Sequence, residues 1–519
     1  MSAKELSSHV EEEGLLDQPS SIDDTNLRPA LRFLYVLTAL ASLGAILLGY
    51  DVGVMSGAIL FIEPEFNLTT FETEIIVSSL NLISLFGALF AGKFSDSFGR
   101  KKTIAIASVI FIAASVLMAL ANGFWMLLVG RLIAGLGVGA ALVLPPIYIA
   151  EISPARFRGK LVTFSEICQN IGILLGYISG YSFANLPDNI NWRVMLGLGV
   201  VPAIMMLLSL LIMPESPRWL VKEGRLEEAE TTLRLTFYDD EVNDALASIE
   251  QALKEERILL ADVGWMDLLR PTPAVKLMLI AGVGAAFFQQ ASGSEAAVYY
   301  TPKILAEAGI EGERNAIAGA IVVGAFKTTT LIIASLLLDK IGRRPMMITS
   351  TIVVMIALSL LGMSFMINAP PFAMIGGMCL YMIGFGIGLG PVGWLLIAEI
   401  FPLQLRGRAM AIGTAVNRLV SGTVALTFLS LSESISQAGA FFMYSGIAFC
   451  ALIFSIVFIP ETTNKTLEEL IVEFQLAAST HDLSVIRKRK RIKNSSLSTL
   501  ADESSESLVS NGEDEPNGI

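Results

Sequence analysis

The chain has 519 residues, of which 53% are hydrophobic and 16% are charged. Because soluble domains carry roughly 25% charged residues, this composition excludes a soluble protein and predicts an all-α integral membrane protein surrounded by lipid bilayer. The net charge of −12 arises largely in the tails and a central loop, so it indicates no nucleic-acid partner. Both histidines, His9 and His481, lie in the tails, and we expect no metal ion and no cofactor.

The first apolar run carries a single charge. Asp51 lies in the middle of the stretch from Phe33 to Phe61, which exceeds the roughly 20 residues that span a bilayer. A carboxylate at membrane depth is costly unless it meets a partner or water. Asp51 is therefore either half of a structural ion pair or a proton-binding site, because a carboxylate can lose its charge by taking a proton. We favour the proton-binding site.

Twelve apolar runs predict twelve membrane helices in two sets of six. They lie at about 33–60, 74–92, 103–121, 124–148, 163–184 and 194–213, then 275–300, 316–338, 346–367, 372–398, 409–430 and 439–459. The predicted organisation is a disordered tail (1–30), a first half (31–213), an insert of short amphipathic helices (214–274), a second half (275–466) and a C-terminal tail (467–519).

Basic residues gather in alternate loops, and this pattern predicts the orientation. Lys93, Arg100 and Lys101 follow the second helix, whereas the loop after the first helix contains acids but no lysine or arginine. Because basic loops stay on the cytoplasmic side, both termini and the insert are predicted to be cytoplasmic. The sequence Asn67-Leu68-Thr69 then falls outside, as a possible glycosylation site.

The two halves repeat three loop motifs. The motif that starts at Asp96 recurs at Asp339, the motif that starts at Glu151 recurs at Glu399, and Pro214-Glu215-Ser216 recurs as Pro460-Glu461-Thr462. The shared offset of roughly 245 residues indicates parallel internal repeats, an architecture typical of transporters with a solute site between the halves.

The repeated motifs place acids and arginines at helix ends on the predicted cytoplasmic side. They are Asp96, Arg100, Glu151 and Arg158 in the first half, and Asp339, Arg343, Glu399 and Arg406 in the second. Topology alone explains the basic residues but not the repeated acids. We therefore interpret the set as a cytoplasmic gate, whose ion pairs between helices hold the inner side shut and break during transport.

Several motifs together resemble the sugar porter branch of the major facilitator superfamily. They are GRKK after the second helix, GRLIAGLGVG in the fourth, PESPRWL after the sixth, FFQQASG in the seventh, GRRP after the eighth and PET after the twelfth. Glu166, Glu295, Lys327 and the VNR of helix eleven are similar to plant polyol/monosaccharide proton symporters, although that branch usually has aspartate at the Glu295 position. The resemblance spans about residues 35–470 and implies the major facilitator fold, with twelve transmembrane helices in two six-helix halves and a cytoplasmic helical insert.

The resemblance also implies the solute site. Each hydroxyl of a sugar or polyol both donates and accepts hydrogen bonds, so the site needs amides, with aromatic surface against the C–H faces. Gln289, Gln290 and Asn417 would supply the amides and Trp394 the flat face; hydrogen bonds between helices and plain packing are the alternatives. The glycines around Gly388 are expected to break helix ten and present Trp394.

Two buried charge sets accompany this site. The family places an arginine at Arg131 facing the first helix, which makes it the expected partner and switch of Asp51. Glu166, Glu295, Lys327 and Arg418 sum to zero charge, and we expect these four residues to bind the solute from one network. We expect Glu295 and Lys327 to form an ion pair that shapes the solute cavity, because paired opposite charges can be buried at lower cost.

These features predict a secondary active transporter that imports polyols or monosaccharides, such as a polyol, a hexose or inositol, by proton symport through alternating access. The expected setting is the plasma membrane and the expected state a monomer. A proton-independent facilitative carrier and a transport-silent sugar sensor are the alternatives. An enzyme is not expected, because no pair of nucleophile and base is evident.

Overall fold

The computed structural model describes residues 27–262, 268, 270–463, 465–480 and 482–487. In this part of the chain the regular elements are helices, and twelve segments are long and apolar enough to cross a membrane. The predictions for the ends of both tails, including the disordered N-terminus, fall on residues 1–26 and 488–519, outside the described residues. The all-α membrane architecture with twelve spans is confirmed.

The first half supplies six of these spans, two of which are built from two consecutive helices each. Its helices are α2 (Leu27–Ala41), α3 (Leu43–Phe66), α4 (Thr70–Phe98), α5 (Arg100–Ala119), α6 (Phe124–Ile152), α7 (Ala155–Phe183), α8 (Asp188–Gly197) and α9 (Val200–Ser209). The insert contains α10 (Pro217–Lys222), α11 (Leu226–Arg234) and α12 (Val242–Asp262). The first two are short, as predicted, whereas α12 has 21 residues.

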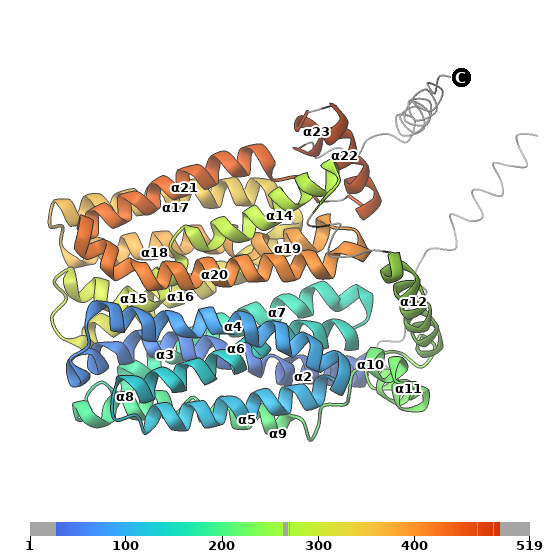
Figure 1. The fold of residues 1–519 in the computed structure, drawn as a ribbon, viewed down its shortest axis with the longest axis horizontal. Coiled ribbons are helices and arrows are strands. Elements are labelled where there is room, and N and C mark those ends of the chain that lie inside the picture. Colours follow the sequence, from blue (N-terminus) through green and yellow to red (C-terminus); the bar gives the residue numbers. More distant parts are fainter. Residues whose placement is uncertain (1–26, 263–267, 269, 464, 481, 488–519) are drawn as a thin grey trace, which may run out of the picture.

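The second half supplies the other six spans. Its helices are α14 (Pro273–Ala291), α15 (Ser294–Glu307), α16 (Glu313–Ile341), α17 (Arg343–Met366), α18 (Pro371–Ile387), α19 (Leu389–Ile400), α20 (Leu403–Ile435) and α21 (Gln437–Phe458). Figure 1 shows the two halves lying side by side, with α10–α12 at one end of the bundle. We call this end the insert face and the opposite end the far face.

The C-terminal segment differs from the polar tail expected beyond residue 466. It forms α22 (Leu467–Thr480) and the short α23 (Ser484–Arg487) beside the insert face (Figure 1). Phe474 is fully buried, and Lys465 forms a buried ion pair with Glu473 at 2.7 Å. Burial raises the pKa of the Glu473 carboxyl, and the hydrogen bond from Lys465 opposes that shift. The helix was not predicted because its apolar positions are interspersed with polar residues.

Close packing of α3 against α7 fixes the position of Asp51. A Cβ atom added to Gly53 would lie 2.1 Å from the backbone oxygen of Ile173, and one added to Gly176 would lie 2.4 Å from the backbone nitrogen of Val54. No side chain fits at these positions, so the two backbones approach as small residues allow within membranes. The helix that carries Asp51 is thereby held in the middle of the first half.

Contacts between the halves close the far face. Lys303 of α15 pairs with Glu63 of α3 at 2.8 Å, and the Tyr177 hydroxyl of α7 donates to the backbone oxygen of Val298 at 2.7 Å. Ile317 of α16 packs against two glycines of the first half near the same end. The far side of the central site is therefore shut in this conformation.

Candidate solute and proton sites

Asp51 and Arg131 form a buried ion pair in the first half. Arg131 Nη1 lies 2.5 Å from Asp51 Oδ2, and the two residues are 0% and 2% exposed. The remaining guanidinium nitrogens donate to the backbone oxygens of Ile76 at 3.1 Å and Val77 at 3.4 Å on α4. The expected partnership is confirmed. Arg131 has other acceptors within reach, so the carboxyl can become neutral without leaving the cation wholly unsatisfied.

The predicted solute amides meet on the second half. Asn417 Nδ2 of α20 donates to Gln289 Oε1 of α14 at 2.6 Å, and Gln290 Nε2 donates to Asn417 Oδ1 at 3.3 Å. Gln289 Nε2 donates to the backbone oxygen of Gly390 at 2.6 Å, which ties the network to α19. The three amides form one buried hydrogen-bonded network that links α14, α19 and α20.

Two spans of the second half are broken beside this network. The break predicted in helix ten is confirmed, because α18 ends at Ile387 and α19 starts at Leu389, with Gly388 between them. Half-buried Trp394 follows on α19. Helix seven also breaks, at Gly293 with φ of 93°, a conformation that favours glycine. This second break was not predicted.

The four remaining charges are arranged differently from expectation. Arg418, which is 5% exposed, donates to Asn417 Oδ1 at 2.6 and 3.2 Å. Lys327 Nζ lies 5.5 Å from the ring centre of Phe385. Glu166 is half-buried on α7, and its carboxyl has no hydrogen-bond or ion-pair partner among the described residues.

The predicted ion pair between Glu295 and Lys327 is wrong for this conformation. No contact within 4.0 Å joins them in the described part of the chain, and they interact only at longer range. The break at Gly293 explains the difference, because it places Glu295 in the first turn of α15. A carboxylate in the first turn is favoured by the free N–H groups of the helix start.

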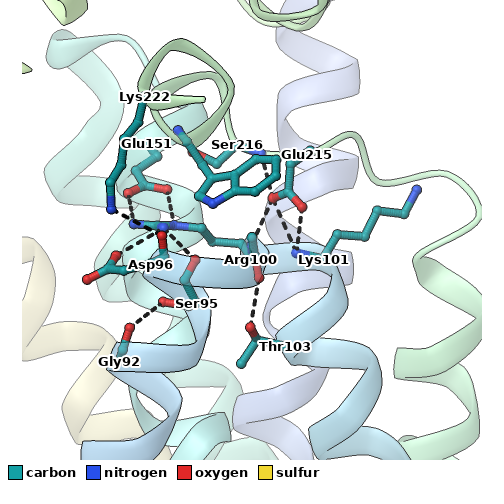
Figure 2. Close-up of polar contacts among 12 residues, drawn as sticks. Gly92, Ser95, Asp96, Arg100, Lys101, Thr103, Glu151, Glu215, Ser216 and Lys222 are labelled. Carbon is teal, nitrogen blue, oxygen red and sulfur yellow. Dashed lines mark hydrogen bonds and ion pairs between the residues drawn. The ribbon is translucent and has the colours of Figure 1, made fainter. Parts of the chain in front are cut away.

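The repeated motifs at the insert face form two matching clusters. In the first half, Figure 2 shows Arg100 pointing at Glu151, with Nε and Nη2 at 2.8 and 2.7 Å from its carboxylate oxygens. Asp96 lies 3.1 Å from the same guanidinium. In the second half, Arg343 lies 2.7 Å from Glu399 and 3.0 Å from Asp339. The predicted pairing between helices is confirmed.

These pairs join helices of the same half, so each cluster stiffens one half. Their action as a gate stays a prediction. The other two arginines of the set lie outside the clusters: Arg158 is exposed, and Arg406 Nε donates to the backbone oxygen of Phe401 at 3.3 Å.

Two acidic residues of these clusters, Glu215 and Glu461, were not predicted as gate residues. Glu215 Oε1 accepts from the backbone N–H of Arg100 at 2.9 Å, beside Ser216 in Figure 2. Glu461 accepts from the backbone N–H of Arg343 at 3.2 Å. Each carboxylate sits at the start of a helix, where the unpaired N–H groups favour an anion. The repeat of Pro-Glu-Ser as Pro-Glu-Thr was the available signal.

Replacing Gly99 with alanine is expected to destabilise the protein by about 1–3 kcal/mol. Gly99 has φ of 93°, and an added Cβ would lie 2.4 Å from the Glu215 carboxylate, so both the backbone and the cluster would have to shift. Thermal unfolding in detergent measures the effect. Gly92→Ala on the same helix is the matched control, because its Cβ would meet nothing within 4 Å. Equal unfolding temperatures for the two variants would contradict this account of the cluster.

Nowhere among the described residues do three or more histidine, cysteine or acidic side chains gather as a metal site would require. The described polar groups at the centre of the bundle are a linked set of amides on the second half and a buried carboxylate paired with an arginine on the first.

Comparison with known proteins finds similarity to sugar and polyol transporters. The profile of the family described as "Sugar (and other) transporter" matches residues 37–474. Probable polyol transporter 4 of Arabidopsis thaliana is 44% identical over 440 residues, which cover 84% of each chain. Polyol transporter 5 of the same plant is 40% identical, over 84% of this chain and 85% of the relative.

Among solved structures, the chain is similar to a sugar transporter. The partially occluded inward-open form of the xylose transporter XylE from E. coli aligns with a TM-score of 0.74 and 29% identity, over 84% of this chain and 100% of that chain. The proton:xylose symporter XylE bound to 6-bromo-6-deoxy-D-glucose aligns with a TM-score of 0.71 and 30% identity, over 85% and 99%.

Proposed function

The chain belongs to the sugar (and other) transporter family and is an integral membrane sugar or polyol transporter, and from this premise we propose that it imports its solute by proton symport. The solute proposed is a polyol, a hexose or inositol. The single observation that supports proton coupling is the buried ion pair of Asp51 and Arg131. Arg131 also donates to backbone oxygens, so Asp51 can gain and lose a proton without leaving the guanidinium without hydrogen bonds.

The coupling proposed runs through α3. Asp51 binds Arg131 within the first half, whereas Glu63 on the same helix binds Lys303 of the second half at 2.8 Å. Protonation of Asp51 removes the charge that ties α3 to α6, and α3, which stays packed on α7, is proposed to shift enough to alter its contact with Lys303. In this way a proton taken up at one residue changes the contact between the halves on which alternating access depends.

On the second half, the linked amides are proposed to bind the solute hydroxyls. Gln289, Gln290 and Asn417 already satisfy one another, so a hydroxyl that replaces one of these bonds leaves no group unpaired. Trp394 would cover the C–H face of the ring or chain. Glu166, Glu295, Lys327 and Arg418 are proposed to tune which solute fits.

The orientation and setting are also proposals. With the termini and the insert face in the cytoplasm, the closed far face is the outer side. We propose the plasma membrane as the location, because the far face would then take solute and protons from outside, and we propose a monomer, because each half already finds its partner within the same chain.

Uptake of a labelled polyol into proteoliposomes tests the proposal. With acid outside and a membrane potential held at zero, the full chain is expected to concentrate the solute inside, and with equal pH it is expected only to equilibrate it. Equilibration in both conditions would instead identify a proton-independent facilitative carrier. Binding without any uptake would identify a sensor, and either result would overturn the symport proposal.

A further inference from the structure

Glu74 is a carboxylate buried where the halves meet near the far face. It lies in the first turns of α4 and is 0% exposed. Its Oε1 accepts from the backbone N–H of Ser430 at 2.8 Å, and its Oε2 lies 2.5 Å from the Ser430 hydroxyl oxygen. Because Ser430 belongs to α20 of the second half, these bonds join the two halves in this conformation.

The surroundings of Glu74 offer it no counter-charge. Among the residues that the structure describes, no basic side chain contacts it, and the charged group nearest along α20 is another acid, Glu433. The titratable groups within electrostatic range of Glu74 on α15 and α21 are the uncharged phenols of Tyr300 and Tyr444. Arg131 of α6 reaches the same helix, but its guanidinium is bound to Asp51. A buried carboxylate with no cation is expensive in its charged form.

In this conformation the Ser430 hydroxyl and backbone N–H both donate to the Glu74 carboxyl. A protonated Glu74 can keep both contacts, because its carbonyl oxygen accepts the backbone N–H and its O–H can donate to Ser430 Oγ. An ionised Glu74 accepts from the same two donors but remains a net charge buried between the halves. Opening of the far face separates α4 from α20 and returns the carboxyl to water, where the ionised form is favoured.

We propose that Glu74 is a second protonation site, distinct from Asp51, and that the far face closes only after Glu74 has taken up a proton. This inference rests on the alternating access proposed above but not on coupling at Asp51. In this proposal Glu74 takes a proton from the solution outside the far face, and that proton is enclosed with the solute when the far face closes.

The experiment follows far-face opening with a buried reporter. Ile317, which is 0% exposed and packs between Gly57 and Gly180, is replaced by cysteine in a chain whose three native cysteines are replaced by serine. A membrane-impermeant maleimide then reacts only when the far face opens. Its rate is divided by that of Glu311→Cys, an exposed position on the same face, which removes the pH dependence of the thiol itself.

Proteoliposomes carrying the reporter chain are labelled with equal pH on both sides. Between about pH 8 and about pH 5.5 the normalised rate is expected to fall about tenfold, since each unit of difference in pKa between two states is worth a factor of ten. Glu74→Gln is neutral and keeps both hydrogen bonds, so it is expected to give the low rate throughout. Glu74→Asp is expected to retain a pH response, and Glu433→Gln is the control at a neighbouring acid.

All variants are also measured with Asp51→Asn, so that a response due to Asp51 is removed. A pH response that survives Asp51→Asn and disappears in Glu74→Gln supports the proposal, whatever the uptake assay says about coupling. A normalised rate that is independent of pH, or one that falls equally in Glu74→Gln, overturns it. Solute exchange by each variant confirms that it is folded.

Discussion

Replacing Asp51 with asparagine is expected to abolish solute accumulation driven by a pH gradient while sparing exchange of solute across the membrane. Asparagine keeps the size and hydrogen bonding of aspartate but cannot ionise, so the variant resembles a transporter that is always protonated. A gradient of one pH unit stores about 1.4 kcal/mol per proton, enough for about tenfold accumulation when one proton crosses with each solute. Wild type should approach that ratio in proteoliposomes, whereas the variant should stop near equal concentrations.

The exchange assay separates loss of coupling from loss of folding. Arg131 retains its bonds to the backbone oxygens of Ile76 and Val77 in the variant, so labelled solute should still exchange for unlabelled solute at equal pH. Asp188→Asn makes the same chemical change at an exposed position at the start of α8 and should accumulate solute normally. An Asp51→Asn variant that still concentrates solute with acid outside would show that Asp51 is structural only.

The meeting of Asp51 and Arg131 was predictable because each is an isolated charge inside an apolar span. In a medium without water, such charges must find each other or a cavity, and the resemblance named the partner. The clusters at the insert face were predictable for a related reason, since a repeat that preserves both acids and arginines preserves their pairing. Isolated charges within apolar spans and repeated loop motifs were therefore enough to predict individual ion pairs.

Contacts that depend on a break in a helix could not be predicted in the same way. The ion pair expected between Glu295 and Lys327 assumed a continuous helix seven. The left-handed conformation of Gly293 precedes a new helix that starts at Ser294 and places Glu295 in its first turn. No pattern in the surrounding sequence distinguishes this glycine from those that only allow close packing.

The far-face contacts were missed because they join residues distant in the sequence. Glu63 and Lys303 lie 240 positions apart, and nothing near either residue identifies the other. Glu74 stood at the start of an apolar run and resembled the last acid of the preceding loop. Only the placement of α4 against α20 turns it into a buried carboxylate between the halves.

The hub of the amide network makes the second strong prediction. Asn417 is 0% exposed, and its Oδ1 is the acceptor for both the Arg418 guanidinium and Gln290. Asn417→Ala is expected to stop uptake and to destabilise the protein by about 3 kcal/mol, because it strands a buried charged donor. Thermal unfolding in detergent and solute uptake measure the two effects separately.

Replacing Asn417 with aspartate separates its role in holding Arg418 from its role in binding the solute. Asn417→Asp keeps an acceptor for Arg418 and adds the opposite charge, so its unfolding temperature should stay near that of the wild type. It removes the N–H that donates to Gln289 at 2.6 Å, and loss of about 1.4 kcal/mol from solute binding would lower affinity about tenfold. Ser421→Ala, one turn further on α20, removes a buried hydroxyl without a partner among the described residues and should change neither property. If Asn417→Ala unfolds at the same temperature as Ser421→Ala, Arg418 does not depend on this amide, and the network is not what holds the cation in the membrane.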